Sequence, residues 1–259
     1  MLRQWIEAQP MPVIALVVFG LAYVFAAVVF VLVTKAPERW THHFGHISPV
    51  TVTSMAVVLG VLLGFVAARV WANFDRALGY IGREASALAE VLVLADSLPP
   101  DVRASLREAV TAHVKAAEDE EWPAMARRET ISRHSPHALT HAVAAILAFT
   151  PERTGEQLAQ SRALVALETA LEARRNRIML SGVTLDRTQW WVIMGLFVLV
   201  IATVAMVHVG NPISNAIALF LVASAAATSF VLLLAYDHPL SALGGIFVKP
   251  TLLREIVAY

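Results

Sequence analysis

Histidines are the first residues in this chain whose spacing suggests chemistry, because an imidazole nitrogen is a common metal ligand. They form two groups at short spacing: His42, His43 and His46, and His134, His137 and His141. Gly45 and Pro49 oppose the rigid helix that would align two ligands of the first group, and a proline separates His134 from its two neighbours. We interpret both groups as polar surface. Metal binding is the alternative, and an elemental analysis would decide it.

An acidic run, Glu118-Asp119-Glu120-Glu121, is the next candidate for chemistry. A calcium loop needs oxygen ligands at alternating positions and a glycine turn, and this run has neither, so we interpret it as a solvated helix end. The chain has no cysteine, which excludes disulfides and thiol catalysis. It also lacks a phosphate loop, a Rossmann fingerprint and a hydrolase serine motif. These patterns predict neither an enzyme nor a cofactor.

The elements that must carry these residues are mostly apolar helices. Hydrophobic residues make up 58% of the 259-residue chain, and the zero formal net charge gives no overall attraction to nucleic acid. Four stretches are predicted to cross a bilayer: 11–33, 50–70, 190–209 and 213–236. Apart from Arg69 at the end of the second, they contain no charged residue. This disfavours proton-coupled carriers, pumps and voltage sensors.

Basic residues near the span ends predict the orientation of the chain. One side of the membrane holds Arg69, Arg76, Arg83, Arg174, Arg175, Arg177, Arg187, Lys249 and Arg254. The other side holds only Lys35 and Arg39. Both termini, the middle region 71–187 and the tail 237–259 are therefore predicted to be cytoplasmic.

The second span and the residues after it share one pattern. Small and apolar residues recur in steps of four and three: Gly60, Gly64, Ala67, Trp71, Phe74, Leu78, Ile81, Ala85, Leu88 and Leu92. This predicts one helix with a single seam that continues from the membrane into the cytosol. The apolar face of 101–117, which includes His113, and the stripe that ends at Ile178 predict further helices. The expected fold is an all-α integral membrane protein with four transmembrane helices and a helical cytoplasmic domain between the second and third.

Four spans are too few to enclose a hydrated path, so a channel built from this chain would be a ring of identical copies. Each copy would turn the small and apolar face of its second span to the axis: Thr53, Ser54, Val57, Gly60, Val61, Gly64, Phe65 and Ala68. Val57, Val61 and Phe65 would gate by dewetting. The glycines either line the passage or let helices pack closely.

Four segments of the sequence resemble bacterial bestrophin-like membrane proteins. They are WANFDRALGYIGREASALAEVLVLADSLP from Trp71, EEWPAM at 120–125, EARRNRIMLSG at 172–182 and DHPLSALGG at 237–245. The resemblance implies a pentameric anion channel in a bacterial inner membrane, with the second span lining the pore and the cytosolic helices extending it. It implies membrane lipids and permeant ions as the other partners.

The resemblance also draws attention to charged residues within those segments: Arg83, Glu84, Arg174, Arg175, Arg177, Asp237 and His238. We interpret them as structural ion pairs, Glu84 with an arginine of 174–177, and Asp237 as a cap or a bridge at the exit of the fourth span. The alternative is an anion-attracting vestibule. The sequence departs from bestrophins at the neck, where only Phe65 matches an Ile-Phe-Pro pattern, and it lacks their acidic calcium clasp after the last span.

Three classes of function remain. The first is a homo-oligomeric ion channel, which we favour. The second is a non-conducting membrane scaffold or sensor whose helical domain binds a partner. A membrane enzyme remains only if one histidine group binds a metal.

Overall fold

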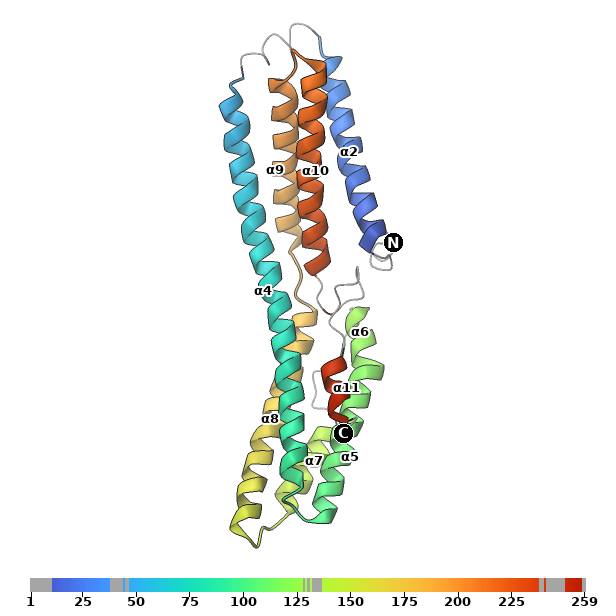
Figure 1. The fold of residues 1–259 in the computed structure, drawn as a ribbon, viewed down its shortest axis with the longest axis vertical. Helices are drawn as coiled ribbons and strands as arrows, with labels where there is room; N and C mark the ends of the chain where they lie inside the picture. Colours follow the sequence, from blue (N-terminus) through green and yellow to red (C-terminus); the bar gives the residue numbers. More distant parts are fainter. Residues whose placement is uncertain are drawn as a thin grey trace. The chain divides into compact units, whose positions relative to one another are not determined.

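The computed structural model describes residues 11–37, 44, 47–127, 129, 131, 137–237, 240 and 250–257, and every regular element among them is a helix (Figure 1). The chain divides into two units. The membrane unit comprises Met1–Ala72, Thr184–His238 and Leu243–Ile246. The helical unit comprises Asn73–Val183, Pro239–Ala242 and Phe247–Tyr259. Helix α4 contributes its first part to the membrane unit and its second part to the helical unit.

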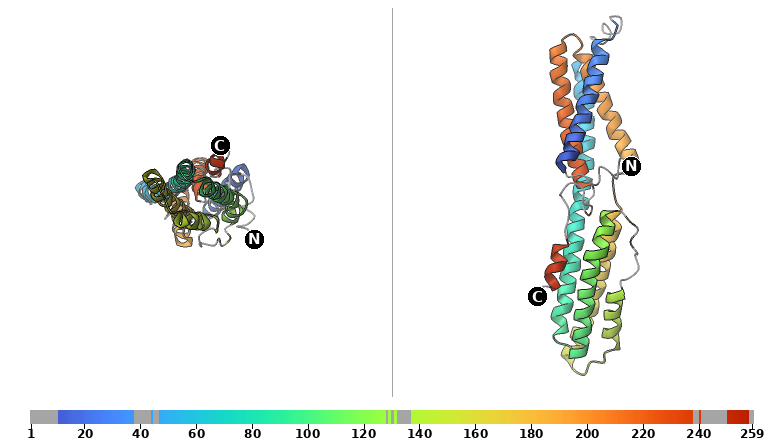
Figure 2. Two further views of the ribbon diagram at one scale, coloured as in Figure 1. Left: turned by 90° about the horizontal axis from the view of Figure 1, so that it is seen from below. Right: turned by 90° about the vertical axis from the view of Figure 1, so that its right-hand side faces the viewer.

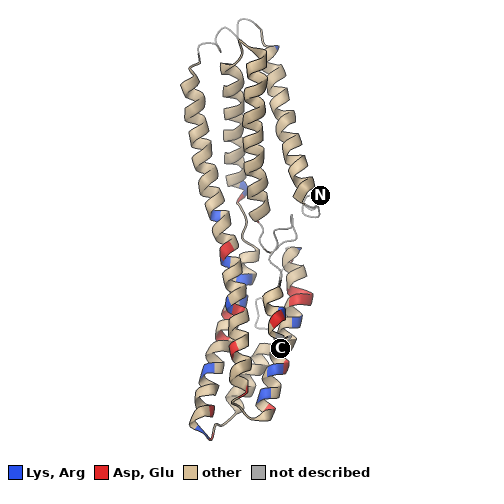
Figure 3. Ribbon diagram, viewed as in Figure 1, with Lys and Arg blue, Asp and Glu red and all other residues tan. Residues whose placement is uncertain are grey.

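Four helices are long and apolar enough to cross a membrane. They are α2 (Met11–Thr34), α4 (Pro49–Ala95), α9 (Arg187–Val207) and α10 (Pro212–Tyr236). Figure 3 shows that charged residues are absent from α2, α10 and most of the first part of α4, where Arg69 is the exception, and that they gather in the helical unit. The expected all-helical fold with four membrane-spanning helices is confirmed. The second of these helices is continuous over 47 residues, as its pattern predicted.

The core of the membrane unit lies between α2, α9 and α10. Helix α10 packs along both of the others, and its buried Ala223, Ala226 and Ala227 allow that close approach. The turn between α9 and α10 is capped by Asn211, whose Oδ1 accepts hydrogen bonds from the backbone N–H groups of Ile213 and Ser214, both at 3.1 Å. The short capped turn therefore fixes α9 and α10 as a hairpin.

The helical unit packs the second part of α4 with α5 (Pro100–Ala116), α7 (His137–Ala148) and α8 (Thr154–Ser181) into one bundle, in which α7 contacts α5 and α8 (Figure 2). Helix α5 continues into the π-helix η1 (Ala117–Glu121) and then α6 (Trp122–Ala126). The largest fully buried apolar side chains of the core include Ile81, Leu88, Leu106, Leu139, Ile146 and Leu167. The buried face predicted for α5 is confirmed, including His113.

The predicted seam of α4 is correct from Ile81 onward but fails at several earlier positions. Ile81, Ala85 and Leu88 are buried, but Gly60, Gly64 and Leu78 are exposed. In the membrane unit the buried side of α4 carries Leu59, Val66 and Val70 instead. A strict repeat of 3.5 residues drifts by about 20° per heptad on a straight α-helix. Over several heptads the predicted line therefore moves away from the side that packs.

The C-terminal segment contributes a short helix, α11 (Thr251–Val257), to the helical unit. Leu253 is fully buried in the core of that unit, and Arg254 forms an ion pair with Glu118 at 3.1 Å. The segment expected to be only a tail is thus partly a packed element.

Candidate functional site

All eight residues predicted to line a pore lie on one exposed side of α4. They are Thr53, Ser54, Val57, Gly60, Val61, Gly64, Phe65 and Ala68. Val61 is 55% exposed and Phe65 is 72% exposed, whereas Val66 on the opposite side is only 5% exposed. A chain that buries one side of a membrane helix and leaves an apolar side bare presents that side to lipid or to another protein surface.

The two glycines of this exposed side do not serve packing within the chain. A Cβ atom added at Gly60 or Gly64 would meet no other atom within 4 Å. Ser54 donates its hydroxyl to the Val50 carbonyl oxygen at 3.0 Å, which satisfies the hydroxyl within the helix. Between Thr53 and Ala68, the exposed side of α4 therefore carries small or apolar side chains and no charged group.

A cluster of buried charges joins α4, η1 and α8 inside the helical unit. Arg177 donates from Nε to Glu84 Oε2 at 2.8 Å and from Nη2 to Glu84 Oε1 at 3.1 Å. The same Nη2 donates to Glu121 Oε2 at 2.7 Å, and Arg174 donates from Nε to Glu121 Oε1 at 2.7 Å. Two arginines thus neutralise two carboxylates, in the bidentate geometry that makes such pairs strong.

Two further side chains complete this cluster. His113 Nε2 lies 2.9 Å from Glu84 Oε1, and because an ionised carboxylate only accepts, the nitrogen donates. The Trp122 ring lies under the Arg177 guanidinium at 4.2 Å, which adds a cation–π contact. Glu84 and Arg177 are completely buried. The cluster is therefore a buried structural network in which carboxylates hold both arginines away from solvent.

The pKa values of the central pair follow from this geometry. Glu84 lies well beyond the charge-free part of α4, which ends at Ala68. Burial opposes its ionisation, but Arg177 and the hydrogen bonds from His113 and Arg177 outweigh burial and hold the pKa of Glu84 below its ordinary value. Burial likewise opposes the charge of Arg177, yet Glu84 and Glu121 raise its pKa. Both groups stay charged at neutral pH.

This lowered pKa predicts acid sensitivity of the helical unit. Ionised Glu84 contributes stability that is complete above the ordinary glutamate pKa of about 4.3 and is lost as the pH falls through the lower folded-state pKa. We expect the melting temperature to decrease as the pH is lowered below the ordinary glutamate pKa. Glu84→Gln should weaken this dependence, whereas Glu90→Gln on the exposed side of the same helix should keep it. Circular dichroism melts of the detergent-solubilised chain at stepped pH would measure both.

The remaining predicted charged residues lie apart from this cluster. Arg83 and Arg175 are exposed, unlike the buried Arg174 and Arg177. Asp237 is buried, and its Oδ1 accepts a hydrogen bond from the Leu185 backbone N–H at 2.8 Å. It thereby ties the end of α10 to the start of α9. His238 lies outside the described residues.

Glu121 was assigned to a solvated helix end, and this was wrong. Glu121 is only 7% exposed and pairs with both arginines. The physical reason is η1, because a π-helical turn inserts one residue and rotates the following side chains relative to an α-helix. That rotation brings Glu121, Trp122 and Met125 to the buried side.

The structure brings no metal site together among the residues it describes. His42, His43, His46 and His134 lie outside those residues, as does the side chain of His137, and His141 is exposed on α7. Metal binding by either histidine group therefore remains a hypothesis, which an elemental analysis of the purified protein would test.

Comparison with known proteins identifies a family profile and solved structures that are similar to most of this chain. A family profile described as a Bestrophin-like domain matches residues 20–251. A crystal structure of a bacterial bestrophin homologue from Klebsiella pneumoniae with a tryptophan-to-alanine mutation superposes with a TM-score of 0.72 at 12% identity, covering 96% of each chain. Another structure of a bacterial bestrophin homologue from that organism, from Zn-SAD phasing, gives 0.69 at 13% identity, covering 93% of this chain and 95% of that one. Comparison with curated proteins gave no match.

Proposed function

The chain belongs to the bestrophin-like family, and on this premise we propose that it forms a homo-oligomeric ion channel in a bacterial inner membrane. The pore is the space enclosed by the exposed sides of the α4 helices, one from each copy. The helical unit is cytoplasmic, as are both termini.

The exposed side of α4 is the observation that supports this proposal most strongly. Thr53 to Ala68 present small and apolar side chains on that side, while Leu59, Val66 and Val70 hold the helix against the rest of the membrane unit. A ring of copies would turn this side to a common axis, where the valine and phenylalanine rings form a dewettable constriction. Gly60 and Gly64 then set the width of the passage between those rings.

The finer part of the proposal is that five copies assemble and that anions pass more readily than cations. Arg69, Arg76 and Arg83 follow the charge-free stretch at seven-residue spacing, so they share one side of α4, and all three are exposed. Their positive charges raise the local anion concentration. The exposed carboxylate of Asp75 offsets one of these positive charges, so the net charge of the four residues remains positive.

Planar bilayer recording of the purified chain in a potassium chloride gradient tests both parts. We expect discrete currents whose reversal potential has the sign of the chloride equilibrium potential. Currents that reverse at the potassium potential would overturn the anion preference and keep the channel. If a correctly assembled oligomer gave no current in the bilayer, the channel proposal would be wrong and a scaffold role would be favoured.

A further inference from the structure

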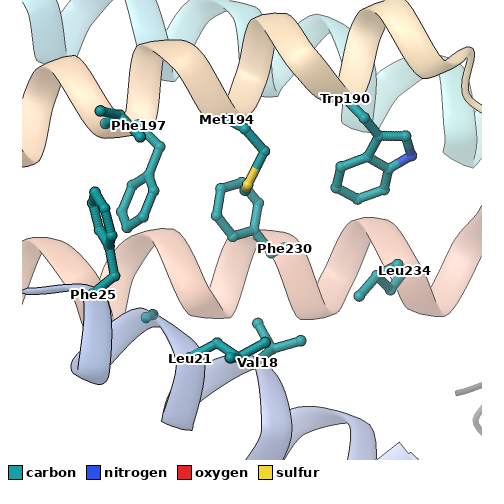
Figure 4. Close-up of a pocket in the computed structure, with 10 residues that line it drawn as sticks. Val18, Leu21, Phe25, Trp190, Met194, Phe197, Phe230 and Leu234 are labelled. Carbon is teal, nitrogen blue, oxygen red and sulfur yellow. The ribbon is translucent and has the colours of Figure 1, made fainter. Parts of the chain in front are cut away.

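An apolar groove lies between α2, α9 and α10 on the membrane unit. Its volume is about 420 Å³, within the range of small-molecule sites. Figure 4 shows Trp190 and Leu234 at one end, Phe25 and Phe197 at the other, and Val18, Leu21, Met194 and Phe230 between them. The groove opens outward, since Leu21 is 66% and Val198 44% exposed.

The end of the groove at Phe25 and Phe197 is closed by packed aromatic rings. Phe197 lies 5.8 Å from Phe25 and 5.5 Å from Phe230, measured between ring centroids, and the second pair meets edge to face. From Trp190 to Phe197 the helix rises by about 10 Å. The groove is thus a slot along the membrane helices with one closed end.

Along the α9 side of this groove, a charged residue is followed by apolar residues, just as the charged headgroup of a phospholipid is followed by its acyl chains. Arg187, Trp190, Met194 and Phe197 follow one another in steps of three and four, so they lie on one side of the helix. Arg187 is exposed and forms no ion pair with any residue in the described part of the chain. Arginine suits a phosphate, tryptophan the headgroup level, and the residues beyond it an acyl chain.

We propose that this groove binds one anionic phospholipid, with an acyl chain against Phe25, Met194 and Phe197 and the phosphate at Arg187. The surrounding solvent at this depth is lipid tails, so a tail that enters the slot gains packing contacts with the aromatic rings. Arg187 adds selection for a negative headgroup, because it is exposed, pairs with no acidic side chain among the described residues, and lies one turn before Trp190 at the N-terminal end of α9.

Native mass spectrometry of the delipidated oligomer, titrated with phosphatidylglycerol and separately with phosphatidylcholine, tests this site. We expect one tight phosphatidylglycerol per chain and weaker phosphatidylcholine. Arg187→Gln should weaken phosphatidylglycerol about tenfold and Arg187→Lys should recover most of it. Arg69→Gln, which removes an exposed arginine elsewhere at the same boundary, should leave the tight site intact.

A second pair of variants addresses the groove itself. Leu21→Trp fills the slot and should abolish the tight site, while Leu16→Trp, on another side of α2 and 74% exposed, should not. Equal binding by all these variants would overturn the proposal, as would equal affinity for both lipids. If Leu21→Trp instead breaks the oligomer while the parent chain binds no lipid, the groove is filled by a neighbouring copy and the proposal is wrong. Gel filtration and melting temperature monitor folding throughout.

Discussion

Replacing Arg177 by methionine is expected to destabilise the helical unit by about 3–5 kcal/mol, because it leaves Glu84 buried without its cation and Glu121 with only Arg174. This is a large part of the 5–15 kcal/mol that typically holds a domain together. The Arg177 side chain is fully buried, so water cannot solvate the carboxylates that would lose their partner. The thermal melt of the purified chain, followed by circular dichroism, should shift sharply downward.

Arg175→Met is the matched control, two residues away on α8 and exposed. Its effect should stay within about 0.5 kcal/mol, as for surface substitutions. A second comparison uses the double variant Glu84→Met, Arg177→Met. It removes one charge of each sign and leaves Glu121 with Arg174, so it should melt above Arg177→Met alone. Equal melting of the Arg177 and Arg175 variants would show that the buried charges do not support the fold.

Replacing Val61 by serine is expected to raise the conductance of the oligomer about tenfold, which corresponds to a barrier lowered by about 1.4 kcal/mol. Val61 lies midway along the exposed side of α4, one turn from Val57 and from Phe65. A ring of hydroxyls there would hold water in a constriction that valine keeps dry. Single-channel currents in planar bilayers measure the change.

Val24→Ser makes the same chemical change on α2, where the side chain is also exposed, at 63%. Because α2 is not expected at the axis, this variant should conduct as the parent chain does. A conductance that rises equally in both variants, or in neither, would argue that Val61 does not face the permeation path.

The sequence predicted the spans well because each needs about twenty apolar residues and four such stretches are present. It also predicted the continuous α4, since no proline interrupts the pattern. The packed side of α4 in the membrane was not predictable in the same way. Leu59, Val66 and Val70 differ little in polarity from the exposed Val57 and Val61, so hydropathy does not distinguish them.

The buried charge cluster shows a different limit. A pairing of Glu84 with an arginine of 174–177 was expected from the segments that resemble the family, and in the structure that arginine is Arg177. The burial of Glu121 was not predicted, because the π-helical turn of η1 breaks the 3.6-residue period on which pattern arguments rest. His113 was placed on the buried side of α5, yet its bond to Glu84 needed coordinates.

The chain contains no cysteine, so a single introduced cysteine is a unique label, and this allows the most direct test of the pore. Currents through Val61→Cys and Val24→Cys would be recorded before and after a charged, water-soluble thiol reagent. We expect the reagent to block current through Val61→Cys and to leave current through Val24→Cys unchanged. Steady current through a Val61→Cys chain shown by mass to carry the reagent would contradict it, since α4 would then not line the path.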